Sequence, residues 1–149
     1  MRIVHYIIGT ALGSGYFPVA PGTAGSLLAL FLFWFLPVSS VIWIILILLF
    51  FILGVCSGSV IEKEQGHDPQ IVVIDEVVGQ WMSLLFIPHT LPWFMGAFLL
   101  FRLFDIWKPW PVDKLQNLPG GWGIMMDDVM AGIYTALLIH LLLISGIFQ

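Results

Sequence analysis

Residues 41–60 read VIWIILILLFFILGVCSGSV, twenty positions without a charged side chain. A helix that spans the hydrocarbon core of a bilayer needs about 20 apolar residues. A second run of the same kind, VMAGIYTALLIHLLLISGIF, occupies residues 129–148. These two stretches predict transmembrane helices, and they favour one fold class, an all-α multi-pass membrane bundle.

The composition of the whole chain agrees with this fold class. Hydrophobic residues make up 60% of the 149 positions and charged residues 9%, whereas soluble proteins have about 45–50% and about 25%. The length fits a single domain over residues 1–149. A soluble helical bundle with a very apolar core is the alternative, which the shortage of charge disfavours. The formal net charge of −4 argues against nucleic acid as a partner.

Other apolar runs are interrupted by turn-forming residues. The run at 24–36 ends in the Pro-Val-Ser-Ser segment at 37–40, and the run at 77–101 is divided by two prolines within 88–92. The sequence therefore predicts five helices, at about 24–37, 41–61, 71–87, 92–107 and 126–147. The first, third and fourth are marginal in length, so they are expected either as tilted spans or as segments that enter the bilayer partway.

The charged side chains are confined to Arg2 and to residues 62–76 and 102–128. Passing the five helices through a bilayer puts these windows on one side and the uncharged turns on the other. Because Lys and Arg are enriched on the cytoplasmic side of membranes, we predict that the charged side is cytoplasmic. His5 interrupts the apolar stretch after Arg2 and no small-residue cleavage site follows, so a cleaved signal peptide is not expected.

Five carboxylates lie where apolar helices begin or end. Charged groups in membrane proteins are expected at interfaces or in polar cavities, and paired. The nearby cations are too few to balance five acids, and a divalent cation would relieve the repulsion. Oxygen ligands without a His or Cys cluster favour Mg²⁺ or Mn²⁺ over Zn²⁺. We therefore predict a Mg²⁺ site formed by Asp75, Glu76, Asp105, Asp127 and Asp128, against the alternative of separate, solvated acids.

Two segments predict phosphate binding. In FRLFDIWKPWP (residues 101–111), a helix places Arg102, Asp105 and Lys108 on one face. Arginine binds phosphate through two parallel N–H groups, and lysine acts as a point charge. Gly22 and Thr23 precede an apolar helix, where Thr23 is expected to cap the N–H groups of the first turn. Anchoring of Arg102 and Lys108 at the headgroups is the alternative.

Other polar residues have less specific patterns. Glu62, Lys63, Glu64 and Asp68 are expected to form a solvated loop. The four histidines are scattered and predict no metal site.

Together these segments resemble the phosphatidylglycerophosphatase A family of bacterial membrane phosphatases. The likeness extends from FPVAPGTAGS (17–26) through IDEVVG (74–79) and FRLFDIWKP (101–109) to MMDDVMAG (125–132). It implies Mg²⁺-dependent hydrolysis of phosphatidylglycerophosphate to phosphatidylglycerol and phosphate in phospholipid synthesis, at the cytoplasmic face of the bacterial inner membrane.

The catalytic candidates are then Asp105, Asp127, Asp128 and Lys108, and the substrate's acyl chains stay among the membrane phospholipids. The choice between metal ligand and base among the acids stays open, as does oligomeric state. Direct attack by water is preferred over an aspartyl-phosphate intermediate. The alternative function is a small membrane transporter or channel subunit that uses the acids as an ion relay.

Overall fold

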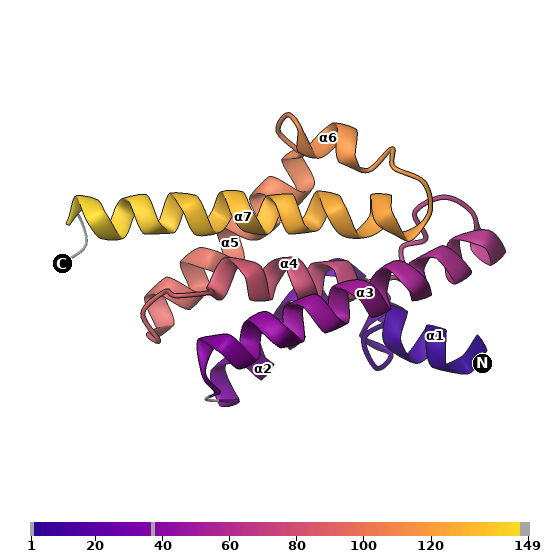
Figure 1. Cartoon of the computed structure of the whole chain (residues 1–149), viewed down its shortest axis with the longest axis horizontal. Helices are drawn as coiled ribbons and strands as arrows, with labels where there is room; N and C mark the ends of the chain where they lie inside the picture. Colours follow the sequence, from indigo (N-terminus) through magenta and orange to yellow (C-terminus); the bar gives the residue numbers. More distant parts are fainter. Residues whose placement is uncertain (1, 37, 147–149) are drawn as a thin grey trace.

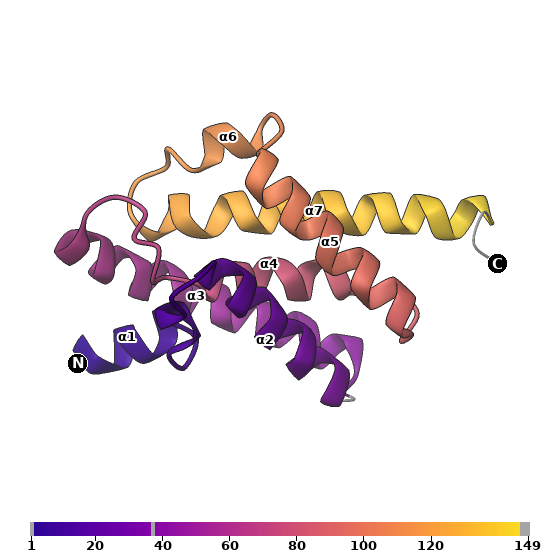
Figure 2. The same cartoon turned by 180° about the vertical axis from the view of Figure 1, so that it is seen from behind.

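The computed structural model describes residues 2–36 and 38–146 (Figures 1 and 2). Every regular element in this part of the chain is helical, so the predicted all-α class is confirmed. In chain order the elements are α1 (Arg2–Gly9), the 3₁₀ turn η1 (Ser14–Tyr16), α2 (Pro21–Phe35), α3 (Ser40–Gln65), α4 (Ile74–Leu84), α5 (Leu91–Trp107), α6 (Val112–Leu115) and α7 (Gly121–Ser145).

Helix α4 lies at the centre of the molecule and contacts α2, α3, α5 and α7 (Figure 1). Nine of its 11 residues are buried. Val77, Val78 and Trp81 pack into the main hydrophobic core. The Trp81 indole N–H also donates a hydrogen bond of 3.0 Å to the Ala29 carbonyl of α2. Protein therefore surrounds most of α4.

Helices α4 and α7 approach each other closely at two glycines. A Cβ atom added to Gly132 would overlap the carbonyl oxygen of Gly79, and one added to Gly79 would lie 2.6 Å from the carbonyl oxygen of Asp128. Glycine lets helix backbones come together in this way because it has no side chain to separate them. The contact therefore fixes α4 against the first half of α7.

Within the described residues, two helices are long and apolar enough to cross a membrane, α3 and α7. In the most apolar 18-residue window of each, 28% of the residues are buried. The other residues of both windows are partly or fully exposed, as in Ile52 and Ile144, which are 60% and 83% exposed. A helix in the core of a soluble protein would be mostly buried instead, so these surfaces suit lipid.

The other three predicted helices are shorter. Helix α4 has 11 residues, or about 16 Å at a rise of about 1.5 Å per residue, roughly half of a hydrocarbon core. It was predicted at 71–87, but it begins at Ile74 and ends at Leu84. Helices α2 and α5 have 15 and 17 residues, also below the usual length of a span.

Several predicted helix starts differ from the structure. Helix α2 begins at Pro21 with Ala20 as its N-cap, so the prediction that Thr23 caps this helix was wrong. Proline suits the first helical turn because its missing N–H would have no partner there. Helix α7 begins at Gly121 rather than near 126. Helices α1 and α6 were not predicted, because each is too short to give a clear apolar period.

The uncharged turns lie at one end of the molecule. Figure 1 shows the α2–α3 and α4–α5 connections on the left, where α7 also ends. The charged end of α3 and the first turns of α4 and α7 lie farther to the right in the same view. The charged windows are thus separated from the uncharged turns along the long helices.

We expect Gly132→Ala to lower the free energy of unfolding by about 1–3 kcal/mol, because the added methyl group overlaps the Gly79 backbone. Gly96→Ala is the matched control, since a Cβ there would meet no heavy atom of the described residues within 4 Å. The control should raise stability by about 0.5–1 kcal/mol through the better helix propensity of alanine. Thermal unfolding in detergent measures both, and equal midpoints would contradict the close contact.

Candidate functional site

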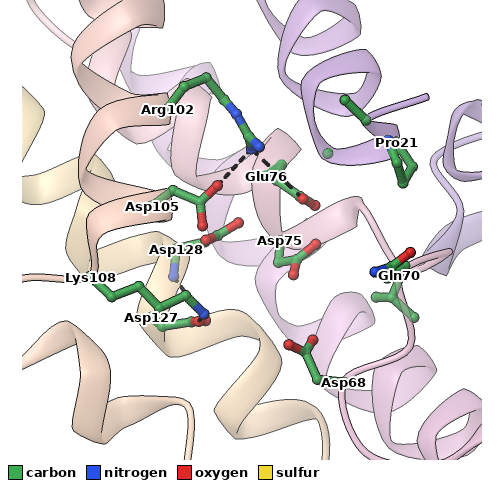
Figure 3. A pocket seen from close by; sticks show the side chains of 13 residues that line it. Pro21, Asp68, Gln70, Asp75, Glu76, Arg102, Asp105, Lys108, Asp127 and Asp128 are labelled. Atoms are coloured by element: carbon green, nitrogen blue, oxygen red, sulfur yellow. Dashed lines mark hydrogen bonds and ion pairs between the residues drawn. The ribbon is translucent and has the colours of Figure 1, made fainter.

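A polar pocket of about 340 Å³ lies between the start of α2, the α3–α4 loop, α4, α5 and α7 (Figure 3). This volume is within the range of about 300–1,000 Å³ that holds small ligands. Six carboxylates and two cations line the pocket: Asp68, Asp75, Glu76, Asp105, Asp127, Asp128, Arg102 and Lys108. The charged windows of the sequence therefore meet in one place.

Three of these acids come from the facing turns of α4 and α7. One oxygen atom from each of Asp75, Glu76 and Asp128 lies within 4.8 Å of the other two. Asp75 Oδ1, Glu76 Oε2 and Asp128 Oδ2 are buried and receive no hydrogen bond from any described residue. Buried carboxylates without partners are unfavourable unless another charge compensates them. This oxygen-only cluster therefore fits a hard divalent cation.

The two acids of α4 lie outside the two candidate membrane-spanning helices. Burial raises the pKa of Asp75 well above its ordinary value, and the charge of Glu76 raises it further. Burial also raises the pKa of Glu76 to about 7, although the charge of Arg102 partly opposes this. Both pKa values are raised because negative charge is unfavourable in a buried site without a cation.

Arg102 reaches across the pocket from α5 (Figure 3). Its Nη1 atom lies 2.6 Å from Asp105 Oδ2 and 3.8 Å from Glu76 Oε1. The alignment of these ion pairs leaves Nε and Nη1, which are buried, without a hydrogen-bond acceptor among the described residues. Arg102 therefore keeps N–H donors available for another anion.

Lys108 follows the last residue of α5 and adopts a left-handed conformation with φ of 47°. Its Nζ donates hydrogen bonds of 2.7 Å to Asp127 Oδ2 and 3.0 Å to Gln116 Oε1. Burial lowers the pKa of the Lys108 ammonium, but the hydrogen bond and the charge of Asp127 outweigh this, so the pKa is raised. Lys108 is therefore a stable positive charge at the pocket wall.

The five acids of the predicted metal set all line the pocket, and they divide into two groups. Asp75, Glu76 and Asp128 form the cluster of close oxygen atoms. Asp105 pairs with Arg102, and Asp127 pairs with Lys108. The sequence placed these residues on one face but gave no means of assigning the pairs.

The two predicted residues of α2 have different positions. Gly22 lines the pocket, and a Cβ added there would collide with the Glu76 carboxylate. A larger residue at position 22 would therefore displace this carboxylate. Thr23, predicted to bind phosphate, is not among the described residues that line the pocket.

Sequence reasoning missed three polar side chains of the pocket region. Asp68 was predicted to be part of a solvated loop, yet Asp68 and Gln70 both line the pocket. Gln116, from the segment after α6, accepts a hydrogen bond from Lys108. Asp68 lies in the same charged window as Asp75, and this shared window could have indicated that it belongs to the site. Gln70 and Gln116 carry no charge, so nothing in the sequence pattern pointed to them.

Comparisons with known proteins show which sequences the chain is similar to. The family model described as Phosphatidylglycerophosphatase A matches residues 7–143. Proteins named phosphatidylglycerophosphatase A from Escherichia coli K12 and Haemophilus influenzae are each 38% identical to the chain, which they cover to 88% and 90%. The alignments span 78% and 85% of these two relatives.

A Bacteroides thetaiotaomicron protein, provisionally named a phosphatidylinositol-3-phosphatase, is 46% identical over 89% of both chains. No solved structure matches the chain. The family match covers most of the sequence and includes every acid and both cations discussed above. This protein is therefore a phosphatase rather than a transporter or channel subunit, and the chain belongs to the phosphatidylglycerophosphatase A family.

Proposed function

We propose that this protein is a Mg²⁺-dependent phosphatidylglycerophosphatase that releases the terminal phosphate of phosphatidylglycerophosphate and leaves phosphatidylglycerol, as a step of bacterial phospholipid synthesis. One observation supports this above others. Within the described residues, three buried carboxylate oxygens accept no hydrogen bond, and Arg102 Nε and Nη1 donate none, although Nη1 is ion-paired with Asp105. A cation together with a phosphate group satisfies both sets. The names of the E. coli and H. influenzae relatives support the lipid substrate.

Asp75, Glu76 and Asp128 would hold the cation, because their oxygen atoms are close together and unpartnered. Bound there, Mg²⁺ supplies neutralisation of the negative charge that gathers on the phosphoryl oxygens. Oxygen ligands and the absence of histidine and cysteine from the cluster support Mg²⁺ over Zn²⁺.

Arg102 and Lys108 bind the phosphate from the α5 side of the pocket. The Arg102 N–H groups match two phosphate oxygens, and the Lys108 ammonium adds a single charge. The start of α2 adds favourable backbone dipoles, and Gly22 lets the phosphate approach that backbone. The two cations hold the phosphorus in line between the attacking water and the oxygen that leaves with the headgroup.

Asp105 and Asp127 are the candidates for moving the proton. Each forms an ion pair with a cation: Asp105 lies 2.6 Å from Arg102, and Asp127 lies 2.7 Å from Lys108. When phosphate oxygens take over these cations, a carboxylate is freed to accept the proton of the attacking water. The water oxygen forms the new bond to phosphorus, and the bond from phosphorus to the headgroup oxygen breaks. The proton taken from the water then passes to that oxygen, which leaves as a hydroxyl group of the headgroup.

The pocket lies near the charged part of the molecule, which we place at the cytoplasmic face of the inner membrane. Helices α3 and α7 span the bilayer, and the shorter helices pack against them. The acyl chains of the substrate then stay in the lipid, so the pocket needs to recognise only the headgroup. This explains how about 340 Å³ suffices for a lipid substrate.

Phosphatidylinositol 3-phosphate is a second candidate substrate, because the name of the B. thetaiotaomicron relative, at 46% identity, refers to it. Both lipids carry a phosphomonoester on a polyol headgroup. Phosphate release from the two lipids, from phosphatidic acid and from a soluble phosphomonoester separates the candidates, and we expect phosphatidylglycerophosphate to react fastest.

Mg²⁺ should raise the unfolding temperature of the purified protein. At a hundredfold excess over its dissociation constant, it should add about 2.7 kcal/mol to the free energy of unfolding. In Asp128→Asn this increment should be largely lost. Without Mg²⁺ the same variant should be as stable as the wild type or more so, because one of three close negative charges is gone. Asp113→Asn, which changes an exposed acid of helix α6, is the matched control. An equal Mg²⁺ effect in Asp128→Asn would argue against the cation site.

Arg102→Ala should lower kcat/KM for phosphatidylglycerophosphate by about a hundredfold or more, because it removes charge-assisted hydrogen bonds to the phosphate. Asp105→Asn, Asp127→Asn and Lys108→Ala should each lower kcat as well. Lys114→Ala, an exposed cation outside the pocket, controls for loss of positive charge. Full activity in all four pocket variants would refute the assigned site.

The membrane topology predicts which single cysteines react with an impermeant reagent. In a background without Cys56, cysteines at Ser39 and Ser145 should be labelled from the outside of intact cells, since both lie at the uncharged end. A cysteine at Asn117, beside the pocket elements, should react only after the membrane is opened. If cysteines at positions 39 and 145 were labelled only from the cytoplasm, the protein would have the opposite orientation to the one proposed.

A further inference from the structure

One wall of the pocket has no role in holding the cation or the phosphate. It comes from the loop between α3 and α4, which contributes Asp68 and Gln70. In Figure 3, Arg102 and Lys108 lie on the α5 side, and Asp68 and Gln70 lie on the other side, with Asp75 between. A phosphate held by the two cations therefore leaves this loop facing the remainder of the headgroup.

Both side chains are available to a ligand. Neither Asp68 nor Gln70 forms a hydrogen bond or ion pair with any residue that the structure describes, and both are exposed. Asp68 also has a φ of 49°, in the left-handed region. Aspartate tolerates this conformation better than most residues. The loop thus turns at Asp68 while its carboxylate remains at the pocket.

The chemistry of this wall suits a hydroxyl group rather than a phosphate. A carboxylate repels a phosphate but accepts a hydrogen bond from a hydroxyl group, and an amide both donates and accepts. Asp68 is not one of the three acids whose oxygen atoms cluster together. The pocket also has more room than one phosphate group needs.

We propose that Asp68 and Gln70 select the headgroup by binding the hydroxyl group next to the phosphorylated carbon. This inference rests on the proposed function, and it applies to any substrate in which a free hydroxyl group neighbours the phosphomonoester. The glycerol of phosphatidylglycerophosphate has such a hydroxyl group, and so does a phosphorylated inositol. Phosphatidic acid has an ester at that position instead.

The test compares phosphatidylglycerophosphate with an analogue that differs by one atom, in which hydrogen replaces the free hydroxyl group of the headgroup glycerol. Charge, both phosphates and acyl chains stay the same. For the wild type, we expect kcat/KM to be about ten- to a hundredfold higher with the hydroxyl group present, as for loss of a hydrogen bond to a charged group. In Asp68→Gly this preference should fall to near one through a lower kcat/KM on the natural lipid, with the analogue unchanged.

Asp68→Gly removes the carboxylate while keeping the left-handed backbone accessible, because glycine adopts positive φ readily. Asp68→Asn should retain an intermediate preference, since its amide oxygen still accepts a hydrogen bond. Gln70→Ala should lower the preference less than Asp68→Gly. Asp113→Ala, which removes an acid outside the pocket, is the control and should keep the wild-type ratio.

A wild type that hydrolyses both lipids equally well would overturn the inference and leave the proposed phosphatase function standing. An Asp68→Gly variant that loses activity on both lipids in proportion would also overturn it, because the residue would then serve folding or the cation. Absence of phosphate release from either lipid by the wild type would overturn the proposed function and this inference together.

Discussion

The contact between Gly79 of α4 and Gly132 of α7 sets the distance between the two helices that carry most of the pocket acids. Asp75 and Glu76 lie within about one turn of Gly79, and Asp128 lies one turn before Gly132. With side chains at the glycines, the helices would separate and their acids would move apart. The backbone contact therefore brings the oxygen atoms of these three acids within 4.8 Å of one another. Packing and chemistry depend on the same pair of residues.

Helix α5 completes this arrangement from a third direction. It supplies Arg102, and Lys108 follows its last residue. The ion pairs of these cations with Asp105 and Asp127 offset part of the repulsion among the buried acids. Ion pairs in a buried site seldom stabilise a fold on balance, because both partners lose their hydration. Their position beside unpartnered carboxylates is better explained by function. Under the proposed membrane topology, the apolar outer faces of α3 and α7 instead stabilise the fold through their contacts with the surrounding lipid.

Sequence periodicity and charge placement predicted the helical class, the five main helices and the convergence of the acids. These features depend on composition over long stretches, where single residues matter little. The bounds of α2 and α4 were less predictable, because Pro21 can start a helix before its apolar run and α4 ends inside the protein. Pairings such as Lys108 with Asp127 depend on helix crossing, which no local pattern encodes. The prediction that Thr23 caps α2 was wrong for the same reason as the predicted start of that helix.

Asp68 shows a different limit. In the sequence it belongs to a polar stretch after α3 and resembles any solvated loop residue. The turn that carries it back to the pocket depends on a left-handed backbone at Asp68 itself and on the position of α4. Three-dimensional placement, rather than residue type, separates it from Glu64, which instead pairs with Arg2 at the start of α1.

The charges that line the pocket have a consequence for the order of binding. Six carboxylates face two cations there, an excess of four negative charges that equals the formal net charge of the whole chain. The charges of the residues outside the pocket sum to zero. The formal negative charge is thus concentrated at the pocket, where it attracts cations and repels anions. Under the proposed function, a divalent cation held by Asp75, Glu76 and Asp128 would lower this formal excess from four negative charges to two, so binding of the cation first would ease the approach of a phosphate-bearing lipid.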